Sequence, residues 1–349
     1  MKIKIIGAGS MGHHLAYASR RMGWDATVID NDPKALLRMK NEVYPARYGS
    51  WDESIKLFSP EEEPKGGFDI IAFGTPPDVT VKLAAKAFEE KPKLLHLEKP
   101  FCPPTLEGAD ELIAQINKNP ETIVTVGYMY SVSEGIAAVA EILTSGKLGE
   151  ILNLDVECRE HWGQGVLKAH PWISGPWDTY LGYYKRGGGA ACENSHGLHL
   201  WLYLADRMGW KGITDVKAAF SMRSENGSNY DGTAAFLLKE KSGRVGRVTQ
   251  DTITSPTKFW LRAQGEKGFL EWYCRGVPEG DVVRWQEEGK EVQEKIFKKE
   301  RADDFYRMVL HYKDLLDGSA SVENSPLSFD RGYRVMKILS AAFKEEKLI

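Results

Sequence analysis

Residues 1–126 alternate short apolar runs with segments of helical periodicity. The runs that predict β-strands are Lys2–Ile6, Val28–Asp30, Phe68–Phe73, Leu94–Leu97 and Ile123–Val126. Apolar residues at helical spacing predict helices between them, at Met11–Met22, Pro33–Lys40, Val79–Glu90 and Thr105–Asn117. Strands that alternate with helices build βαβ units, so we expect a doubly wound parallel sheet of the α/β class in this part of the chain.

The pattern changes after Gly127. A predicted helix, Glu134–Thr144, is followed by runs in which apolar and polar residues alternate, at Ile151–Arg159, Thr214–Ser221, Thr233–Leu238, Arg244–Thr252, Lys258–Ala263, Gly268–Tyr273 and Val282–Trp285. Further helices are expected at Glu193–Ala205, Ala302–Leu316 and Phe329–Glu346. Strands linked mostly by turns predict an α+β domain with a large, mostly antiparallel open sheet. We therefore place the domains at residues 1–126 and 127–349.

Composition narrows the function classes. The chain has 349 residues, which suits two domains, and its 46 Lys and Arg against 49 Asp and Glu give a net charge of -3. This balance argues against a nucleic-acid-binding surface. No apolar run reaches the about 18 residues of a membrane span, and residue 2 already belongs to a predicted strand, so we expect no membrane segment or signal peptide and a cytoplasmic protein. The four cysteines lie far apart without metal-binding spacing and are expected to be reduced thiols.

The first predicted strand runs directly into Gly7-Ala8-Gly9-Ser10-Met11-Gly12. This is the dinucleotide-binding fingerprint of a Rossmann domain, in which Gly7 forms the tight turn, Gly9 admits a pyrophosphate and Gly12 lets the helix pack on the sheet. The helix that begins near Met11 directs its free N–H groups at the phosphates. We expect Gly7, Gly9, Ser10, Met11 and Gly12 to bind a dinucleotide.

Asp30 ends the second predicted strand and indicates which dinucleotide binds. Its carboxylate can accept hydrogen bonds from both ribose hydroxyls but would repel a 2′-phosphate, and Asp32 adds a second negative charge. NAD(H) is therefore favoured over NADP(H). The alternative is that Asp30 only caps a turn before Pro33.

Two loops follow neighbouring strands of the predicted parallel sheet. Gly74-Thr75-Pro76-Pro77 ends one strand and Glu98-Lys99-Pro100 ends the next. Ligands of such sheets lie beyond the carboxyl ends of the strands, so both loops would face the nicotinamide. Lys99 could then hydrogen-bond a substrate hydroxyl and stabilise an alkoxide. A surface lysine without a catalytic role is the alternative.

A glycine-rich stretch, residues 187–199, is the second candidate site. A helix starting near Glu193 would place Glu193 and His196 on one face, with His199 one turn further. Histidine has an unperturbed pKa of about 6.5 and is suited to proton transfer near neutral pH. Both histidines could instead be structural. The HExxH pattern of zinc sites is missing, so we expect no metal.

These motifs resemble the glucose-fructose oxidoreductase/inositol dehydrogenase (Gfo/Idh/MocA) family over nearly the whole chain. The resemblance rests on residues 7–12, 74–77, 98–100, 145–149, 187–199 and 265–268. It implies a catalytic role for Lys99, Glu193 and His196, and cofactor contacts from Gly74, Thr75, Pro76, Glu98 and Lys99.

The chain departs from this family in informative ways. In most members the histidine stands four residues after the acid, where this chain has Gly197; Ser195-His196 is instead similar to a branch associated with surface-sugar biosynthesis. His199 is the second candidate for the catalytic histidine. Glu193 replaces the commoner Asp. The candidates for substrate contact are Lys99, Tyr128, His170, Trp172, Asp178, Tyr180, Glu193, His196 and His199. The aromatic residues among them could stack on sugar rings, or form loop core or an oligomer contact.

We expect an NAD(H)-dependent oxidoreductase that acts on a secondary hydroxyl or ketone of a sugar, polyol or nucleotide-linked sugar. A non-catalytic NAD-binding regulator and an enzyme that uses NAD transiently, in glycoside cleavage or epimerisation, are the alternatives. The resemblance also implies a homodimer or homotetramer formed through the broad sheet.

Overall fold

The computed structural model describes residues 1–210 and 212–349, which form two units. The first unit consists of Met1–Cys102, Glu107–Met129 and Arg301–Phe329. The second unit consists of Pro103–Leu106, Tyr130–Glu300 and Asp330–Ile349.

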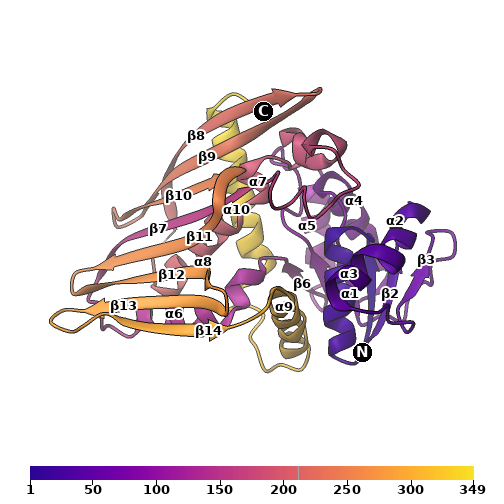
Figure 1. The fold of residues 1–349 in the computed structure, drawn as a ribbon, viewed down its shortest axis with the longest axis horizontal. Coiled ribbons are helices and arrows are strands. Elements are labelled where there is room, and N and C mark those ends of the chain that lie inside the picture. The colour runs from indigo at the N-terminus through magenta and orange to yellow at the C-terminus, as the bar shows by residue number, and fades with distance from the viewer. Residues whose placement is uncertain (211) are drawn as a thin grey trace. The chain divides into compact units, whose positions relative to one another are not determined.

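A six-stranded parallel sheet forms the centre of the first unit (Figure 1). Its strands are β1 (Lys2–Ile6), β2 (Asp25–Ile29), β3 (Lys56–Phe58), β4 (Ile70–Phe73), β5 (Leu94–Leu97) and β6 (Ile123–Val126). Their order, β3-β2-β1-β4-β5-β6, is that of a dinucleotide-binding doubly wound sheet. The predicted Rossmann fold is confirmed.

The helices of the first unit are α1 (Ser10–Arg21), α2 (Pro33–Arg38), α3 (Tyr44–Tyr48), α4 (Pro77–Ala87), α5 (Ala109–Lys118) and α9 (Arg301–Leu316). A π-helical turn, Met39–Val43, joins α2 to α3. Helix α9 comes from the far end of the sequence and packs on α1, where Phe305 stacks on His14 at 3.9 Å and Asp303 pairs with Arg21 at 2.6 Å.

An eight-stranded sheet forms the second unit, in the order β14-β13-β12-β11-β7-β10-β9-β8. The strands are β7 (Ile151–His161), β8 (Ile213–Glu225), β9 (Ser228–Glu240), β10 (Val245–Asp251), β11 (Ile253–Gly265), β12 (Gly268–Val277), β13 (Gly280–Glu287) and β14 (Gln293–Lys298). β7 and β10 pair in parallel, and the other neighbours pair antiparallel. The predicted large, mostly antiparallel sheet is confirmed.

Helices cover one face of this sheet (Figure 1). They are α6 (Glu134–Thr144), α7 (Ala190–Glu193), α8 (His196–Arg207) and α10 (Phe329–Glu345). α6 packs on β12 and β13, and α8 packs on β7 and β10. The strand residues buried between sheet and helices include Leu154, Val156, Leu261 and Leu270, each fully buried. On the opposite face the strands carry charged residues such as Glu271 and Arg262 together with aromatic ones such as Tyr273 and Trp260.

The structure differs from the predicted elements at β3, β14, α5 and the helix predicted at Glu193–Ala205. Strands β3 and β14 are edge strands that the sequence pattern did not predict, and α5 begins at Ala109 because Leu106 and Gly108 have positive φ. The predicted helix Glu193–Ala205 is wrong as a single helix, since α7 ends at Glu193 and α8 begins at His196. The side chain of Asn194 lies in the break and donates a hydrogen bond to the carbonyl of Asp251 at 2.9 Å.

Within the described residues, every helix is too short or too polar to cross a lipid bilayer.

Candidate functional site

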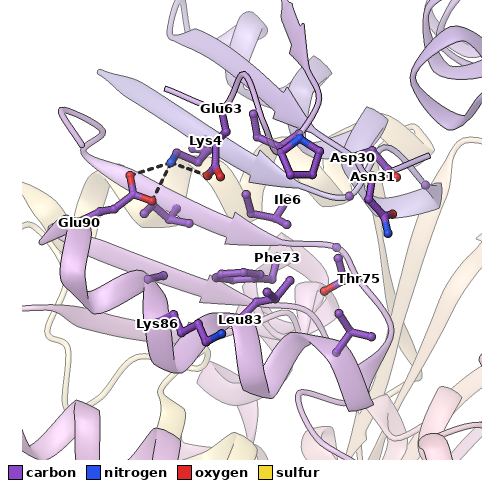
Figure 2. A pocket seen from close by; sticks show the side chains of 18 of the residues that line it. Lys4, Ile6, Asp30, Asn31, Glu63, Phe73, Thr75, Leu83, Lys86 and Glu90 are labelled. Atoms are coloured by element: carbon purple, nitrogen blue, oxygen red, sulfur yellow. Dashed lines mark hydrogen bonds and ion pairs between the residues drawn. The ribbon is translucent and has the colours of Figure 1, made fainter. Parts of the chain in front are cut away.

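A pocket of about 770 Å³ lies on one face of the parallel sheet in the first unit (Figure 2). Six of the residues predicted to bind the cofactor line it, namely Gly7, Gly9, Asp30, Gly74, Thr75 and Pro76. Ser10, Met11 and Gly12 are not in its lining and form the first turn of α1. The pocket therefore collects the loops that follow β1, β2 and β4, three neighbouring strands of the sheet.

The glycines permit close packing where these loops meet. Gly7 has φ +107 and a Cβ atom there would lie 2.9 Å from the carbonyl oxygen of Gly74. A Cβ on Gly12 would overlap the carbonyl oxygen of Gly7. Gly9 differs, because no heavy atom lies within 4 Å of its Cβ position. Gly7 and Gly12 are thus required by packing, whereas Gly9 borders open space.

The N-terminus of α1 is suited to bind an anion. Gly9 is its N-cap residue and provides no side-chain cap, and the first turn contains no acidic residue. The first N–H groups of a helix lack intrahelical acceptors and carry the positive end of the helix dipole. A phosphate placed beside Gly9 would satisfy them.

Asp30 is tied to the glycine loop. Its Oδ2 accepts a hydrogen bond from Ala8 N at 2.7 Å, and its Oδ1 accepts one from Asp32 N at 2.8 Å. The cap of α2 is Asp32, which accepts from Lys34 N at 2.9 Å. A carboxylate has further lone pairs, so both oxygens of Asp30 can also accept from hydroxyl groups.

The far end of the pocket is closed by an ion-pair cluster that the sequence analysis missed. Lys4 Nζ lies 2.7 Å from Glu63 Oε1 and 2.7 and 2.8 Å from the two oxygens of Glu90 (Figure 2). The Lys4 side chain is fully buried, and its ammonium uses all three donors in these bonds. Between this cluster and the loops, Ile6, Phe73 and Leu83 give the pocket an apolar lining. A lysine within an apolar strand was the available sequence signal.

The Glu98-Lys99 loop follows β5 in the same unit. Glu98 is buried, and its Oε1 lies 3.1 Å from His96 Nε2. Tyr128, a predicted substrate contact, follows β6 and is buried in this unit.

In the second unit, the glycine-rich stretch leads into the break between α7 and α8. Glu193 is the last residue of α7, and its Oε2 accepts a hydrogen bond from Tyr180 OH at 3.2 Å. His196 is the first residue of α8, and its ring meets the edge of Tyr130 with 4.7 Å between centroids. The prediction that Glu193 and His196 share one face of a single helix is therefore wrong. The two residues stand on either side of a two-residue break.

The packing of α8 on the sheet explains why residue 197 is a glycine. A Cβ at this position would lie 2.9 Å from Val248 Cγ1, because α8 packs closely on β10. A histidine at 197 would require α8 to move away from the sheet. The imidazole at 196 occupies the preceding position, where the helix begins.

The remaining predicted substrate residues are His199, His170, Trp172 and Asp178. His199 is almost completely buried within α8. His170 Nδ1 donates to the carbonyl of Val166 at 2.6 Å, and its ring meets Trp172 edge-on at 5.1 Å. Asp178 Oδ2 accepts from Ser174 N and Oγ, both at 2.7 Å. It borders a cavity of about 220 Å³ lined by Trp177, Asp178, Thr179, Tyr183 and Arg186.

Asp231 is a buried carboxylate that the sequence analysis did not select. Its Oδ2 accepts a hydrogen bond from Ala191 N at 2.6 Å, and a Cβ on Gly189 would overlap its Oδ1. Complete burial raises the pKa of Asp231 from 3.8 to about 7. Asp231 thus fixes the glycine-rich stretch immediately before Glu193.

Residues 136–271 match the family model described as the GFO/IDH/MocA C-terminal domain. The matched residues lie in the second unit. The resemblance found in the motifs is confirmed there, and the first unit has the fold that it implies. A comparison with curated proteins finds no significant match.

Solved structures share the fold of nearly the whole chain. An NAD binding oxidoreductase from Klebsiella pneumoniae has a TM-score of 0.75 at 16% identity, with 99% of this chain and 97% of that chain covered. An aldose-aldose oxidoreductase from Caulobacter crescentus has a TM-score of 0.74 at 17% identity, with 100% and 98% covered. The WlbA dehydrogenase from Bordetella pertussis, in complex with NADH and UDP-GlcNAcA, has a TM-score of 0.70 at 17% identity, with 99% and 96% covered.

Over residues 1–210 and 212–349, no three His, Cys, Asp or Glu side chains are grouped as a metal site.

The raised pKa of Asp231 predicts how the stability of the protein changes with pH. A carboxyl whose pKa is 3.8 when unfolded and about 7 when folded binds more protons in the folded state between these values. Its contribution to stability is therefore complete below pH 3.8 and is lost as the pH rises to about 7. The unfolding free energy of Asp231→Asn relative to wild type should increase over this range, by at most about 1.4 kcal/mol per pH unit. Denaturant unfolding of both proteins at several pH values measures this difference in unfolding free energy.

The exposed Asp110→Asn is the matched control and should show no such slope. A difference between Asp231→Asn and wild type that is independent of pH would contradict the assignment.

Proposed function

We propose that the chain is an NAD(H)-dependent oxidoreductase acting on a secondary hydroxyl group, or the corresponding ketone, of a sugar, polyol or nucleotide-linked sugar. The observation that carries this proposal is the pocket between the loops after β1, β2 and β4, with the glycine loop and Asp30 in its lining. In an open α/β sheet of this order, ligands bind where the strand order reverses, which is between β1 and β4.

The residues present fit the proposed cofactor. The pyrophosphate would lie beside Gly9 at the uncapped N-terminus of α1, and Asp30 would accept hydrogen bonds from the adenosine ribose. The apolar lining formed by Ile6, Phe73 and Leu83 suits a purine base. A 2′-phosphate would meet the negative charges of Asp30 and Asp32, which favours NAD(H) over NADP(H).

The chemistry would be divided between Lys99 and His196. When bound, NAD⁺ supplies a hydride acceptor at C4 of its nicotinamide. Oxidation of a secondary hydroxyl releases one hydride and one proton, and His196 would accept that proton. The ammonium of Lys99 would donate a hydrogen bond to the same oxygen and stabilise its developing negative charge. Glu193, which already accepts from Tyr180, would orient the substrate or the imidazole.

Two observations support a sugar as substrate. Tyrosine side chains lie next to both candidate residues. Tyr180 donates a hydrogen bond to Glu193, and the ring of Tyr130 contacts that of His196. Such side chains can contact both the apolar face and the hydroxyls of a sugar. The fold is also shared with an aldose-aldose oxidoreductase and with a dehydrogenase that was solved with UDP-GlcNAcA.

The sheet of the second unit supports a homo-oligomer. On the face away from α6 and α8, charged residues of six neighbouring strands are in register and alternate in sign. In strand order they are Glu294, Arg284, Glu271, Arg262, Asp155 and Arg247. Ion pairs join Arg284 to Glu294 at 2.7 Å, while Arg262 pairs with Glu271 and Arg247 with Asp155, both at 3.0 Å. We call this row the charge ladder.

The charge ladder is complementary to itself when reversed. In a second copy related by a two-fold axis along the strands, the row runs in the opposite direction, so Arg284 meets Asp155 of the copy and Arg262 meets Glu271 of the copy. Every position then faces the opposite charge. A neighbouring row, Ile296, Val282, Tyr273 and Trp260, adds apolar surface to the same face. We therefore propose a second copy of this chain as the occupant of the face.

The cofactor is tested by titrating the purified protein with NAD(H) and NADP(H). We expect NAD(H) to bind more tightly. Asp30→Ala should weaken NAD(H) binding by roughly tenfold, because hydrogen bonds to a charged group contribute about 1.5–3 kcal/mol. Asp110→Ala, an exposed acid on α5, should leave the affinity unchanged. Tighter binding of NADP(H), or no binding of either, would contradict the proposed cofactor.

The catalytic assignment is tested by Lys99→Ala and His196→Ala. With a sugar or polyol that the wild type oxidises, each variant should lose at least about 100-fold in kcat while its NAD affinity changes little. Lys118→Ala, an exposed lysine at the end of α5, is the control. NADH absorbance and product analysis are recorded together over a panel of substrates.

The outcomes of this experiment separate the alternatives. Turnover within a few-fold of wild type in both variants would contradict the assignment. Tight NAD binding without reduction by any substrate would favour a regulator, and product without net NADH would favour transient use of the cofactor.

The assembly is tested by sedimentation of charge-reversed variants. Arg284→Asp should raise the dissociation constant of the oligomer by about tenfold or more, since it places like charges across the proposed interface. Adding Asp155→Arg should restore association. These two residues lie on β13 and β7, which are separated by β12 and β11, so they cannot compensate each other within one chain. A monomeric wild type, or a double variant weaker than the single one, would contradict the proposal.

A further inference from the structure

A chain of buried polar side chains crosses from β6 to the loop that carries Lys99. His96 Nδ1 lies 3.0 Å from Thr125 Oγ1, and His96 Nε2 lies 3.1 Å from Glu98 Oε1. Thr125 and His96 are on paired strands, directly opposite each other in the register. His96 is fully buried, and Thr125 and Glu98 are nearly so.

The chemistry of the three groups determines the direction of the hydrogen bonds. An ionised carboxylate can only accept, so Nε2 of His96 carries a proton and donates a hydrogen bond to Glu98. In the neutral imidazole Nδ1 is then an acceptor, and the Thr125 hydroxyl donates to it. Both ring nitrogens are satisfied, which fixes the orientation of the imidazole and, through it, one oxygen of Glu98.

The surroundings hold the carboxylate from other sides. A Cβ on Gly127 would lie 2.5 Å from Glu98 Oε2, so only glycine leaves room for this carboxylate. Tyr312 of α9 packs its ring 4.9 Å from that of His96. Burial and the negative charge of Glu98 together raise the pKa of Tyr312 well above its ordinary value. Glu98 is therefore enclosed by β5, β6 and α9.

The second oxygen of Glu98 faces the next residue of the chain. Glu98 Oε2 accepts a hydrogen bond from Lys99 N at 3.4 Å, at the point where β5 ends and the loop begins. The carboxylate thus links the fixed imidazole to the backbone of Lys99.

Stability alone does not require this arrangement. The strand neighbours of His96 are Leu95 and Leu97, both fully buried, and a leucine at position 96 would continue the apolar strand. Replacing buried polar groups by apolar ones of similar volume is often neutral for stability. A polar chain in such a place indicates a role in the adjacent site.

We propose that His96 and Thr125 are positioning residues, which act through Glu98 to hold the Lys99 loop in the conformation that places its ammonium for catalysis. The inference rests on the proposed function for the role of Lys99. The hydrogen-bond chain itself can be tested without turnover.

The test compares His96→Leu, which removes the donor to Glu98, with His96→Gln, whose amide can still donate. Leu95→Val, a buried change on the same strand, controls for general loss of stability. Three readouts are recorded: the tautomer of His96 by ¹⁵N NMR of histidine-labelled protein, the acylation rate of Lys99 by mass spectrometry, and kcat and KM with NAD and a substrate.

We expect the wild type to show the Nε2–H tautomer. His96→Leu should change the Lys99 acylation rate by threefold or more and lower kcat by about tenfold or more, with KM for NAD changed less. His96→Gln should recover most of both quantities. Leu95→Val should change neither by more than about twofold, even if its Tm falls.

The inference is overturned if His96 is the Nδ1–H tautomer, or if Lys99 acylation in His96→Leu equals that in Leu95→Val. These two results do not depend on catalysis. A wild type that binds NAD but turns over no substrate would defeat the proposed function instead, and the tautomer and acylation rates would still decide the positioning role.

Discussion

The close approach of α1 to the ends of β1 and β4 is the constraint on which the first unit depends. A Cβ on Gly12 would overlap the carbonyl of Gly7, and one on Gly74 would lie 3.1 Å from Met11 Cβ. Three chain segments therefore meet where side chains are excluded. Because α1 starts at this meeting point, its N-terminus opens beside Gly9, where space remains. The anion-binding position is a consequence of backbone packing, and the pocket extends from it along the sheet.

Buried ionisable groups lie beside the candidate functional residues of both units. Lys4, Glu98 and Asp231 are buried ionisable side chains with hydrogen-bond partners. Burying a charge is costly unless it is paired, so packing alone does not favour such residues at these positions. Lys4 closes the pocket, Glu98 joins β5 to the Lys99 loop, and Asp231 fixes the stretch before Glu193.

Much of the fold could be predicted from the sequence, because the βαβ pattern and the alternating strands are local periodicities. The glycine fingerprint, Asp30 and the loop after the predicted strand Phe68–Phe73 together supplied six predicted residues that line one pocket. The features that were not predicted depend on contacts between residues far apart in the sequence. The break before His196 is held by Asn194 reaching the carbonyl of Asp251, far along the chain. The ion pairs of Lys4 with Glu63 and Glu90, and the packing of α9 on α1, join residues that are far apart in the sequence.

The register of β7 connects the two faces of the second unit. Leu154, Val156 and Cys158 point to the helices, whereas Asp155 and Glu157 point to the other face. Because side chains alternate along a strand, a shift by one residue would exchange these sets. It would bury charges under α8, which carries His196, and expose apolar residues where the charge ladder lies. The packing that seats α8 therefore also sets the alternation of charge on the open face, so a substitution that disturbs the register should affect the site and the self-association together.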